Sequence, residues 1–385
     1  MRTAPDGYPA EGWISLMRGD PRPWLLECEE PAALYIALTG LLDVPEDSPE
    51  AEAAHRAVIA DPGTRALVEG LQEWDSPKGF PGHDSPRFVV NGLQLLADMG
   101  LRAGDSPIVE RLLDQILEHQ DHQGRFTSFG TLRSRSEPLW GALLCDTHAA
   151  ADVLLRYGRG GDPRIGTAVT SVAADMQTTA QGPGWPCRPE AQTGFRGPGR
   201  KGDLCPQATL EALRVASQLP ADRRPAGTLP AARTVLGVWR QRADAQPYMF
   251  GHGVRFKRVK WPNLWYDSLW VLETLGRFPE LWRTSGPAES ETCAAAQDRA
   301  ALAELAACLV AYNVDANGRV IPQRTYRGFE TFSFGQKKKP SPFATVRVAV
   351  ALRRLGDLAD DVRSVDIARL GSSKGGSGTP VPPRL

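Results

Sequence analysis

The sequence predicts an all-α protein, an (α/α)6 toroid in which inner and outer helices alternate. Strand patterns are nearly absent, apart from a possible short hairpin around residues 318–320. Apolar helical segments alternate with more polar ones, and a long glycine-containing loop precedes each apolar segment. Because one helix pair cannot bury its own apolar face, the pairs must stack. Loops that all precede inner helices favour a closed ring with its loops gathered at one mouth.

The composition narrows the class of protein. The 385 residues carry 45 basic and 45 acidic side chains, so no basic excess points to nucleic acid. The first residues lack the apolar core of a secretory signal, and no apolar run is long enough to span a membrane. Six cysteines without a signal favour a reduced compartment over a disulfide framework. We therefore expect a cytoplasmic protein.

The chain divides into a polar arm at 1–23, a helical domain at 24–357 and a flexible tail at 358–385. A first long helix is expected from about Pro31, because proline is favoured at the first helical position. Further helical patterns alternate with loops, and the tail is rich in glycine and serine. The expected helical segments are 31–42, 49–59, 61–74, 87–101, 106–120, 137–158, 162–180, 204–219, 229–243, 263–278, 299–313 and 342–356.

These segments form an internal repeat of outer helix, glycine loop and inner helix. Placing Cys145, Cys205 and Asp267 at matching early positions of successive inner helices gives spacings of 60 and 62 residues. The loops before the inner helices would then share one mouth of the ring. Long loops positioned by a rigid scaffold often carry function, so we expect the site there.

Several segments resemble the α/α-toroid proteins with prenyltransferase and squalene-oxidase repeats, which include protein prenyltransferase β subunits and terpenoid cyclases. Bacterial single-domain members of that superfamily look most similar. The resemblance covers roughly residues 24–356 and implies an enzyme acting on an amphipathic, isoprenoid-like substrate, with zinc as cofactor. It is carried by WLLECEEPAALYIALTGLL, LWGALLCDTHAA, GDLCPQATLEAL, WPNLWYDSLWVLETLG and FGQKKKPSPFATVRVAVALRRL.

Two motifs of that superfamily can be compared residue by residue. Prenyltransferase β subunits hold zinc with an Asp-x-Cys and a histidine on the next inner helix. Asp203 and Cys205 resemble the first part, whereas Asp267 stands where the histidine is expected. Class II cyclases use an Asp-x-Asp-Asp acid, and the nearest match, at 357–361, follows the last helix with different spacing. We interpret it as a solvated tail and do not expect protonation-initiated cyclisation.

The cysteines suggest a metal site. Cys145, Cys187 and Cys205 are the expected zinc ligands, since thiolates select zinc and three ligands leave a position open for catalysis. His148 lies one turn after Cys145 and could be a fourth ligand or a base. The alternative is that these cysteines are buried as small hydrophobic residues. Cys28, Cys293 and Cys308 are expected in the core or on the surface.

Carboxylates at the same mouth suggest acid–base chemistry instead. Glycan-active toroids pair one protonated and one ionised carboxyl group, and Asp203 and Asp267 are candidate catalytic residues. Helix capping is the alternative for Asp84 and Asp203, but it explains Asp267 poorly. The other candidates are Asp146 and the aromatic platforms Trp185, Trp261, Trp265 and Tyr266.

Basic residues in three loops could bind the anionic end of a substrate. Solvated surface loops are the alternative. The candidates are Arg196, Arg200, Lys201, Arg255, Lys257, Arg258, Lys260, Lys337, Lys338 and Lys339. A lining for the apolar end would come from Phe80, Trp140, Trp265 and Phe343, and His83 and His252 are candidate proton shuttles.

Three functions follow from these patterns. The first is a metal-dependent enzyme for a small amphipathic substrate, and the second is a glycan-active hydrolase or lyase. The third is a non-catalytic ligand-binding toroid with structural zinc. A partner subunit, as in protein prenyltransferases, is not excluded.

Overall fold

The computed structural model is mostly helical, which confirms the all-α prediction; the toroidal arrangement stays a prediction. Seventeen α-helices and six short strands lie in the described part of the chain. The chain forms two compact units, unit 1 (residues 1–61 and 236–385) and unit 2 (residues 62–235). The structure describes residues 12–76, 85–130, 137–141, 143–188, 194, 196–197, 200–243, 250, 253–283 and 293–370.

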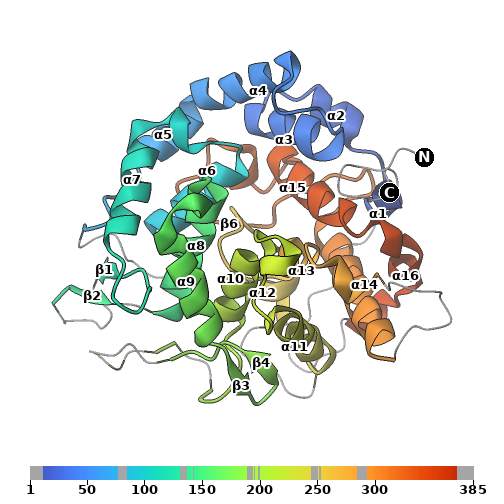
Figure 1. Ribbon diagram of the computed structural model, residues 1–385. Coiled ribbons are helices and arrows are strands. Elements are labelled where there is room, and N and C mark those ends of the chain that lie inside the picture. Colours follow the sequence, from blue (N-terminus) through green and yellow to red (C-terminus); the bar gives the residue numbers. More distant parts are fainter. Residues whose placement is uncertain are drawn as a thin grey trace. The chain divides into compact units, whose positions relative to one another are not determined.

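Unit 2 is built on three apolar helices that pack in series. Helix α8 packs on both α6 and α10, and α9 packs against α8 and α10 (Figure 1). Leu93, Val153 and Leu213, one from each of the three helices in series, are fully buried. The elements of unit 2 are α5 (Pro62–Glu69), α6 (Val89–Asp98), α7 (Pro107–Glu118), β1 (Ser128–Gly130), β2 (Leu139–Gly141), α8 (Leu144–Arg156), α9 (Pro163–Ala174), β3 (Gln177–Thr179), β4 (Gly182–Gly184) and α10 (Pro206–Ser217).

Unit 1 joins the two ends of the chain. Helix α3 packs on α4 and α15, and α14 packs on α13, α16 and α17. Helix α11 (Thr228–Arg240) begins in unit 2 and ends in unit 1. The other elements of unit 1 are α1 (Gly12–Leu16), α2 (Arg22–Leu26), α3 (Pro31–Leu41), α4 (Pro49–Ala60), α12 (Gly253–Lys257), β5 (Lys260–Trp261), α13 (Ser268–Leu275), α14 (Cys293–Asn313), β6 (Arg324–Thr325), α15 (Pro342–Arg353), α16 (Ala359–Ser364) and α17 (Ile367–Leu370).

Helix starts follow the chemistry of the sequence. Proline at the first helical position loses no hydrogen bond, because the first N–H groups of a helix have no partner within it. Side chains of Ser48, Ser106, Asp162 and Ser341 accept hydrogen bonds from those N–H groups. The helices that begin on proline are α3, α4, α5, α7, α9, α10 and α15.

One turn occurs in both units with the same hydrogen bonds. Asp121 Oδ1 accepts from the backbone N–H groups of Gln123 and Arg125 at 2.8 and 2.9 Å. Asp315 Oδ1 accepts from the N–H groups two and four residues later at the same two distances. Each turn follows a helix, α7 or α14, and has a glycine in the left-handed region, Gly124 or Gly318. The repeated turn supports the internal repeat inferred from the sequence.

Three small sheets were missed by the sequence analysis. Strands β1 and β2 pair antiparallel, as do β3 and β4, whereas β5 and β6 pair parallel. The segment 137–158 was expected to be one helix, but it opens with strand β2 and α8 begins only at Leu144. Two- and three-residue strands leave no alternating pattern long enough to recognise.

The ends of the helical region also differ from expectation. Helices α1 and α2 begin within the predicted polar arm, and Trp13 is fully buried. The interpretation of residues 357–361 as a solvated tail is wrong. Asp357 accepts hydrogen bonds from the Trp282 indole and Arg283, and Asp361 pairs with Arg299. Residues 371–385 of the predicted tail lie outside the described part.

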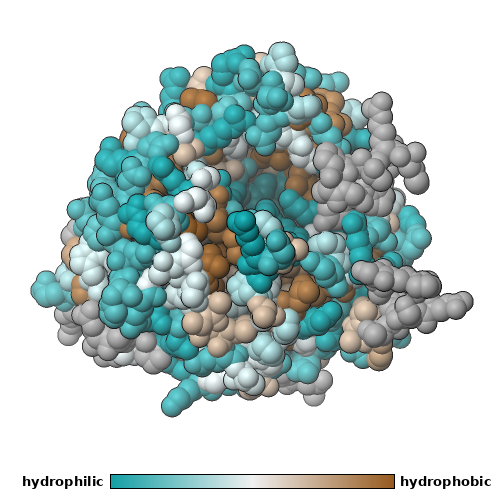
Figure 2. Space-filling model, viewed as in Figure 1, coloured by the Kyte–Doolittle hydropathy of each residue, from teal (hydrophilic) through white to brown (hydrophobic). Residues whose placement is uncertain are grey.

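The surface is mainly hydrophilic on the face seen in Figure 2. Leu26 is the one large hydrophobic side chain that is exposed among the described residues. Within the same residues, no helix combines the length and apolar character needed to cross a bilayer.

Candidate functional site

Cys187 and Cys205 of unit 2 lie beside each other where the β3–β4 hairpin leads toward α10, and Cys145 lies within electrostatic range of both. An antiparallel bridge joins Pro186 to Leu204, and the Cys205 N–H donates to the Trp185 carbonyl at 2.9 Å. These contacts bring Cys187 beside Cys205, the N-cap residue of α10. Cys145 lies in the first turn of α8, the helix that packs on α10. All three residues are partly exposed.

Cys187 carries the reactive sulfur of this group, which we call the thiol cluster (Cys145, Cys187 and Cys205). Its Sγ atom accepts the Gly197 N–H at 3.1 Å. A hydrogen bond from the Cys205 thiol lowers the pKa of Cys187 to about 6, helped by the Gly197 N–H and the charge of Arg196. Cys187 is therefore largely a thiolate at neutral pH.

The other two sulfurs are thiols. The pKa of Cys205 is raised well above its usual value by the hydrogen bond to Cys187 and by burial. Burial also raises the pKa of Cys145, and the negative charges of Asp146, Cys187 and Glu211 add to the effect. The cluster thus holds one thiolate, with a neutral thiol as its hydrogen-bond donor.

Two side chains fix the segment that carries Cys187. The Trp185 indole is buried and donates to the Val172 carbonyl of α9 at 2.7 Å. Arg188 pairs with the buried Asp175 carboxylate at 2.6 Å. Trp185 was predicted to bind substrate, but its burial and hydrogen bond show a core role.

His148, a predicted catalytic residue, is fully buried between α8 and α10. Its Nδ1 atom lies 2.8 Å from the Ala208 carbonyl oxygen, which can only accept, so Nδ1 carries the proton. Nε2 has no hydrogen-bond partner among the described residues. Burial lowers the pKa of His148 to about 4, and the ring is neutral at physiological pH.

A second polar group of unit 2 was missed by the sequence analysis. Asp152 of α8 accepts from Arg214 at 3.2 Å and from Gln218 at 2.7 Å. Glu211, one turn before Arg214 on α10, accepts from Gln207 at 2.8 Å, and burial raises its pKa to about 8. Acidic residues inside apolar helical patterns are the sequence signal that could have found this group.

The repeat alignment needs one correction. Cys205 and Asp267 occupy the same position, the N-cap of α10 and of α13, as expected. The N-cap of α8 is Leu143, so Cys145 lies two residues further along its helix than Cys205 does. Cys145 reaches the thiol cluster through the packing of α8 on α10 and not through an equivalent repeat position.

Asp203 and Arg200, predicted for catalysis and substrate binding, contact each other. The Arg200 guanidinium donates to Asp203 at 2.7 Å, and Gln181 donates to the other carboxylate oxygen at 3.2 Å. Arg200 is largely exposed. The expected capping role of Asp203 is wrong, because α10 begins after Cys205.

Asp267 belongs to unit 1 and caps α13. Oδ1 accepts from the N–H groups of Leu269 and Trp270 at 3.0 and 3.1 Å, and Oδ2 accepts from Asn263 at 2.8 Å. The expectation that a cap explains Asp267 poorly is therefore wrong. Burial raises the pKa of this carboxyl group to about 7.

The other predicted binding residues of unit 1 differ in exposure. Lys257 is buried, and its ammonium group donates to the Leu370 carbonyl at 2.6 Å. Tyr266 is buried beside the half-buried Trp265, with ring centroids 5.1 Å apart. Arg255 and Lys338 are exposed. Lys337 and Lys339 are exposed as well. Phe80, His83, Asp84 and His252 lie outside the described residues.

The remaining cysteines are separate from the thiol cluster. Cys308 is buried in α14, as expected for a core residue, and burial raises its pKa to about 12. Cys293 is exposed at the start of the same helix, and Cys28 is partly exposed. They serve as internal references for thiol reactivity.

The thiol cluster as arranged does not fit a zinc ion. Among the described residues, no three His, Cys, Asp or Glu side chains are grouped as a metal ion requires. Zinc binding stays a prediction, and no chemical step below involves a metal.

Aromatic side chains gather on the hairpin that precedes α8. The Trp140 ring stacks on His119 with centroids 4.0 Å apart and lies 5.1 Å from Phe129. All three residues are half-buried, so part of each ring reaches the surface. The strand that carries Trp140 ends at Gly141 and leads directly to Cys145.

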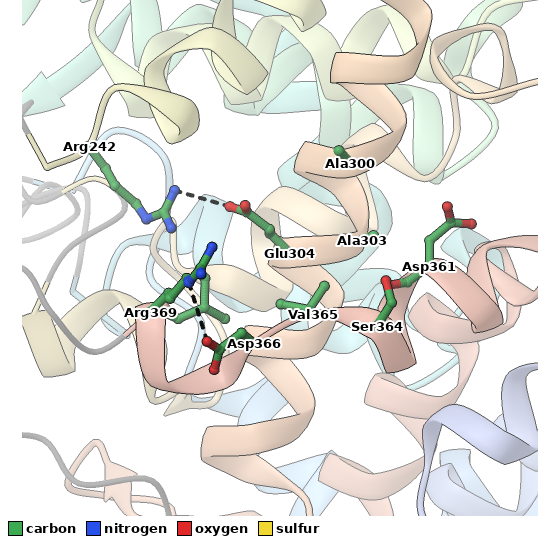
Figure 3. Close-up of a pocket in the computed structure, with 10 residues that line it drawn as sticks. Arg242, Ala300, Ala303, Glu304, Asp361, Ser364, Val365, Asp366 and Arg369 are labelled. Atoms are coloured by element: carbon green, nitrogen blue, oxygen red, sulfur yellow. Dashed lines mark hydrogen bonds and ion pairs between the residues drawn. The ribbon is translucent and has the colours of Figure 1, made fainter.

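Unit 1 has a separate polar cavity of about 290 Å³ between α14, α16 and α17 (Figure 3). Its charges compensate one another: Arg242 pairs with Glu304, Arg369 with Asp366 and Asp361 with Arg299. No residue predicted as a site in the sequence lines it. Such a neutralised cavity offers less chemistry than the thiolate of unit 2.

No protein-family model, curated protein or solved structure matches this chain.

Proposed function

We propose that the chain is an enzyme that uses the Cys187 thiolate as a nucleophile toward an amphipathic substrate. The observation that carries the proposal is the setting of Cys187 Sγ, which accepts the Gly197 N–H at 3.1 Å and a hydrogen bond from the Cys205 thiol. A partly exposed thiolate is the reactive form of cysteine, whereas a buried thiol is inert.

The thiolate supports a two-step group transfer. In the first step the sulfur lone pair forms a bond to an electrophilic carbon, and the leaving group departs with the bonding pair of electrons. In the second step an acceptor forms a bond to that carbon, and the S–C bond pair returns to sulfur. A low pKa favours this second step because it makes Cys187 a better leaving group.

Neighbouring side chains support an amphipathic substrate. Arg196 lies near enough for its charge to act on Cys187, so it can bind an anionic leaving group. The half-buried Trp140, Phe129 and His119 rings offer an apolar surface on the strand that leads to Cys145. This combination agrees with the isoprenoid-like substrate class that the sequence resemblance implies.

Alkylation with matched probes tests the proposal. Iodoacetamide and its N-dodecyl derivative carry the same electrophile, and a thiolate displaces iodide from both. Cys187 should react faster than Cys293, and the dodecyl probe should add a further rate advantage of about tenfold at Cys187 alone. Trp140→Ala should reduce that advantage and leave the iodoacetamide rate unchanged.

The control and the contrary results are defined by the same experiment. Cys187→Ser removes the labelled peptide and leaves labelling at Cys293 unchanged. Equal rates at Cys187 and Cys293 would overturn the nucleophile, and a dodecyl advantage shared by both cysteines would overturn the apolar subsite.

A further inference from the structure

The thiol cluster contains a second sulfur next to the nucleophile. Group transfer by Cys187 needs a hydrogen-bond donor, and a hydroxyl or an N–H group would serve. The chain instead places the thiol of Cys205 there, as a hydrogen-bond donor to the Cys187 sulfur. Two sulfurs in contact can also form a covalent bond with each other.

The backbone directs both side chains to the same side. The bridge between Pro186 and Leu204 pairs the two segments antiparallel. Because side chains alternate along extended chains, Cys187 and Cys205 both lie on the face opposite to the bridged pair. They are diagonal neighbours across that bridge, and the Cys205 thiol donates a hydrogen bond to the Cys187 sulfur.

The backbone around Cys187 and Cys205 is held in place by neighbouring contacts. Trp185 is anchored by its indole hydrogen bond to Val172, and Arg188 by its ion pair with Asp175. Cys205 begins α10, whose next residue is a helix-starting proline. The backbone segments that carry the two sulfurs are therefore each held by their own local contacts.

We propose that Cys187 and Cys205 are a redox-active dithiol that small-molecule disulfides oxidise to an intramolecular disulfide. Cys187 is the attacking sulfur because it is partly exposed and stabilised by the Gly197 N–H. Cys205 is the resolving sulfur because it lies beside Cys187 and is the more deeply buried of the two.

The chemistry balances as two thiol–disulfide exchanges. The Cys187 thiolate attacks one sulfur of the small disulfide, forms a mixed disulfide and releases the first small thiolate. Cys205 loses its proton to that thiolate and attacks the Cys187 sulfur, which forms the internal disulfide and releases a second small thiolate. The protein loses two electrons and the Cys205 proton, and the small disulfide becomes one thiol and one thiolate, which takes a proton from water according to the pH.

Oxidation would switch off the chemistry proposed for Cys187, because a sulfur in a disulfide has no thiolate. That consequence rests on the proposed function, whereas formation of the disulfide does not. The two can be separated, since the disulfide is detected by mass and the nucleophile by its alkylation rate in the reduced protein.

The test is peptide mapping of the full reduced chain after exposure to oxidised glutathione near neutral pH. We expect one internal disulfide between Cys187 and Cys205, free Cys308 and a glutathione adduct at the exposed Cys293. Cys205→Ser should stop the reaction at a stable glutathione adduct on Cys187. Cys293→Ser is the matched control and should leave the internal disulfide unchanged.

Three results would overturn the dithiol. They are a lasting glutathione adduct on Cys187 in the unsubstituted chain, a disulfide that uses Cys145 instead, and no modification of Cys187 at all. A Cys187–Cys205 disulfide without any dodecyl advantage at Cys187 would keep the dithiol and contradict the amphipathic substrate.

Discussion

Asp267 shows how one carboxyl group can look catalytic in the sequence and be structural in the fold. It follows two aromatic residues and lies within an apolar pattern, so the sequence predicts a catalytic acid. The structure gives it three hydrogen bonds, two of them to the first N–H groups of α13. A side chain with three local partners needs no substrate to explain its burial.

Substitution separates the two roles of Asp267. Asn is as good an N-cap as Asp, so Asp267→Asn should change the free energy of unfolding by less than about 1 kcal/mol. Asp267→Ala should cost about 2 kcal/mol, because it removes the cap and leaves the buried Asn263 amide without its acceptor. Urea unfolding measures both. A large loss of stability in the Asn variant would contradict the capping role.

Glu211 gives stability a pH dependence of known sign. Its pKa is raised in the folded chain from 4.5 to about 8. Between these values the unfolded chain releases a proton that the folded chain keeps, so stability falls as pH rises and levels off above pH 8. Glu211→Gln should abolish this fall, which should exceed about 1 kcal/mol between pH 5 and about 9.

Glu273→Gln is the control for the pH dependence expected of Glu211→Gln. Glu273 of α13 pairs with Arg347 at 2.6 Å and is also buried. Breaking this pair leaves an uncompensated guanidinium, so the variant should lose about 3 kcal/mol at both pH values. Urea unfolding at the two pH values tests both substitutions. Parallel pH profiles for Glu211→Gln and the unsubstituted chain would show that Glu211 is not the titrating group.

At the scale of the element, the repeated Asp-x-x-Gly-Arg turn follows α7 in unit 2 and α14 in unit 1. Its glycines are required for two reasons. Both have positive φ, 82° at Gly124 and 74° at Gly318. A Cβ atom would also lie 2.9 Å from the Thr167 carbonyl at Gly124 and 2.5 Å from the Gly19 carbonyl at Gly318.

Alanine at these glycines should therefore be costly. Gly124→Ala and Gly318→Ala should each destabilise the chain by about 2 kcal/mol or more, from backbone strain and overpacking. Gly158 has a similar φ of 78° but open space around a Cβ atom, so Gly158→Ala should lose only about 1 kcal/mol. Thermal unfolding compares the three. Equal losses at all three positions would rule out the close contacts as a cause.

At the scale of the whole molecule, contacts within unit 1 join the N-terminal and C-terminal parts of the chain. Arg353 of α15 donates to the Gly40 carbonyl at 2.8 Å and pairs with Asp43 at 2.7 Å. Glu30 accepts from Ser333 and from the Phe343 N–H at 2.6 and 3.1 Å. These contacts join the N-terminal helices α3 and α4 to the C-terminal part of unit 1.

Arginine substitutions measure how much these contacts contribute to the free energy of unfolding. Arg353→Met should lose about 3 kcal/mol, because the guanidinium is nearly buried and two acceptors lose their donor. Arg363→Met removes an exposed pair with Asp360 and should lose less than about 0.5 kcal/mol. Urea unfolding of the full chain reports both. Similar losses would mean that the joining of these two parts does not depend on Arg353.

Local chemistry made much of the fold predictable, and long-range packing did not. Pro31, Pro206 and Pro342 mark helix starts that the sequence located, because proline acts through its own backbone. The closeness of Cys187 to Cys205 could be suspected from the sequence, because Cys187 lies on the loop that leads to Cys205. The burial of Lys257 and the grouping of Asp152 with Glu211 could not be predicted, because both depend on which helices pack together.

The rate of iodoacetamide alkylation at Cys187, followed by peptide mass against pH, tests the central claim most directly. A thiolate with a pKa of about 6 predicts a rate that is half-maximal near pH 6 and level above neutrality. Cys205→Ser keeps a hydroxyl donor beside the sulfur and should keep the midpoint low, whereas Cys205→Ala should move the midpoint upward because the main hydrogen bond is lost. A rate at Cys187 that still rises between pH 8 and about 9, as for an ordinary thiol, would contradict the account.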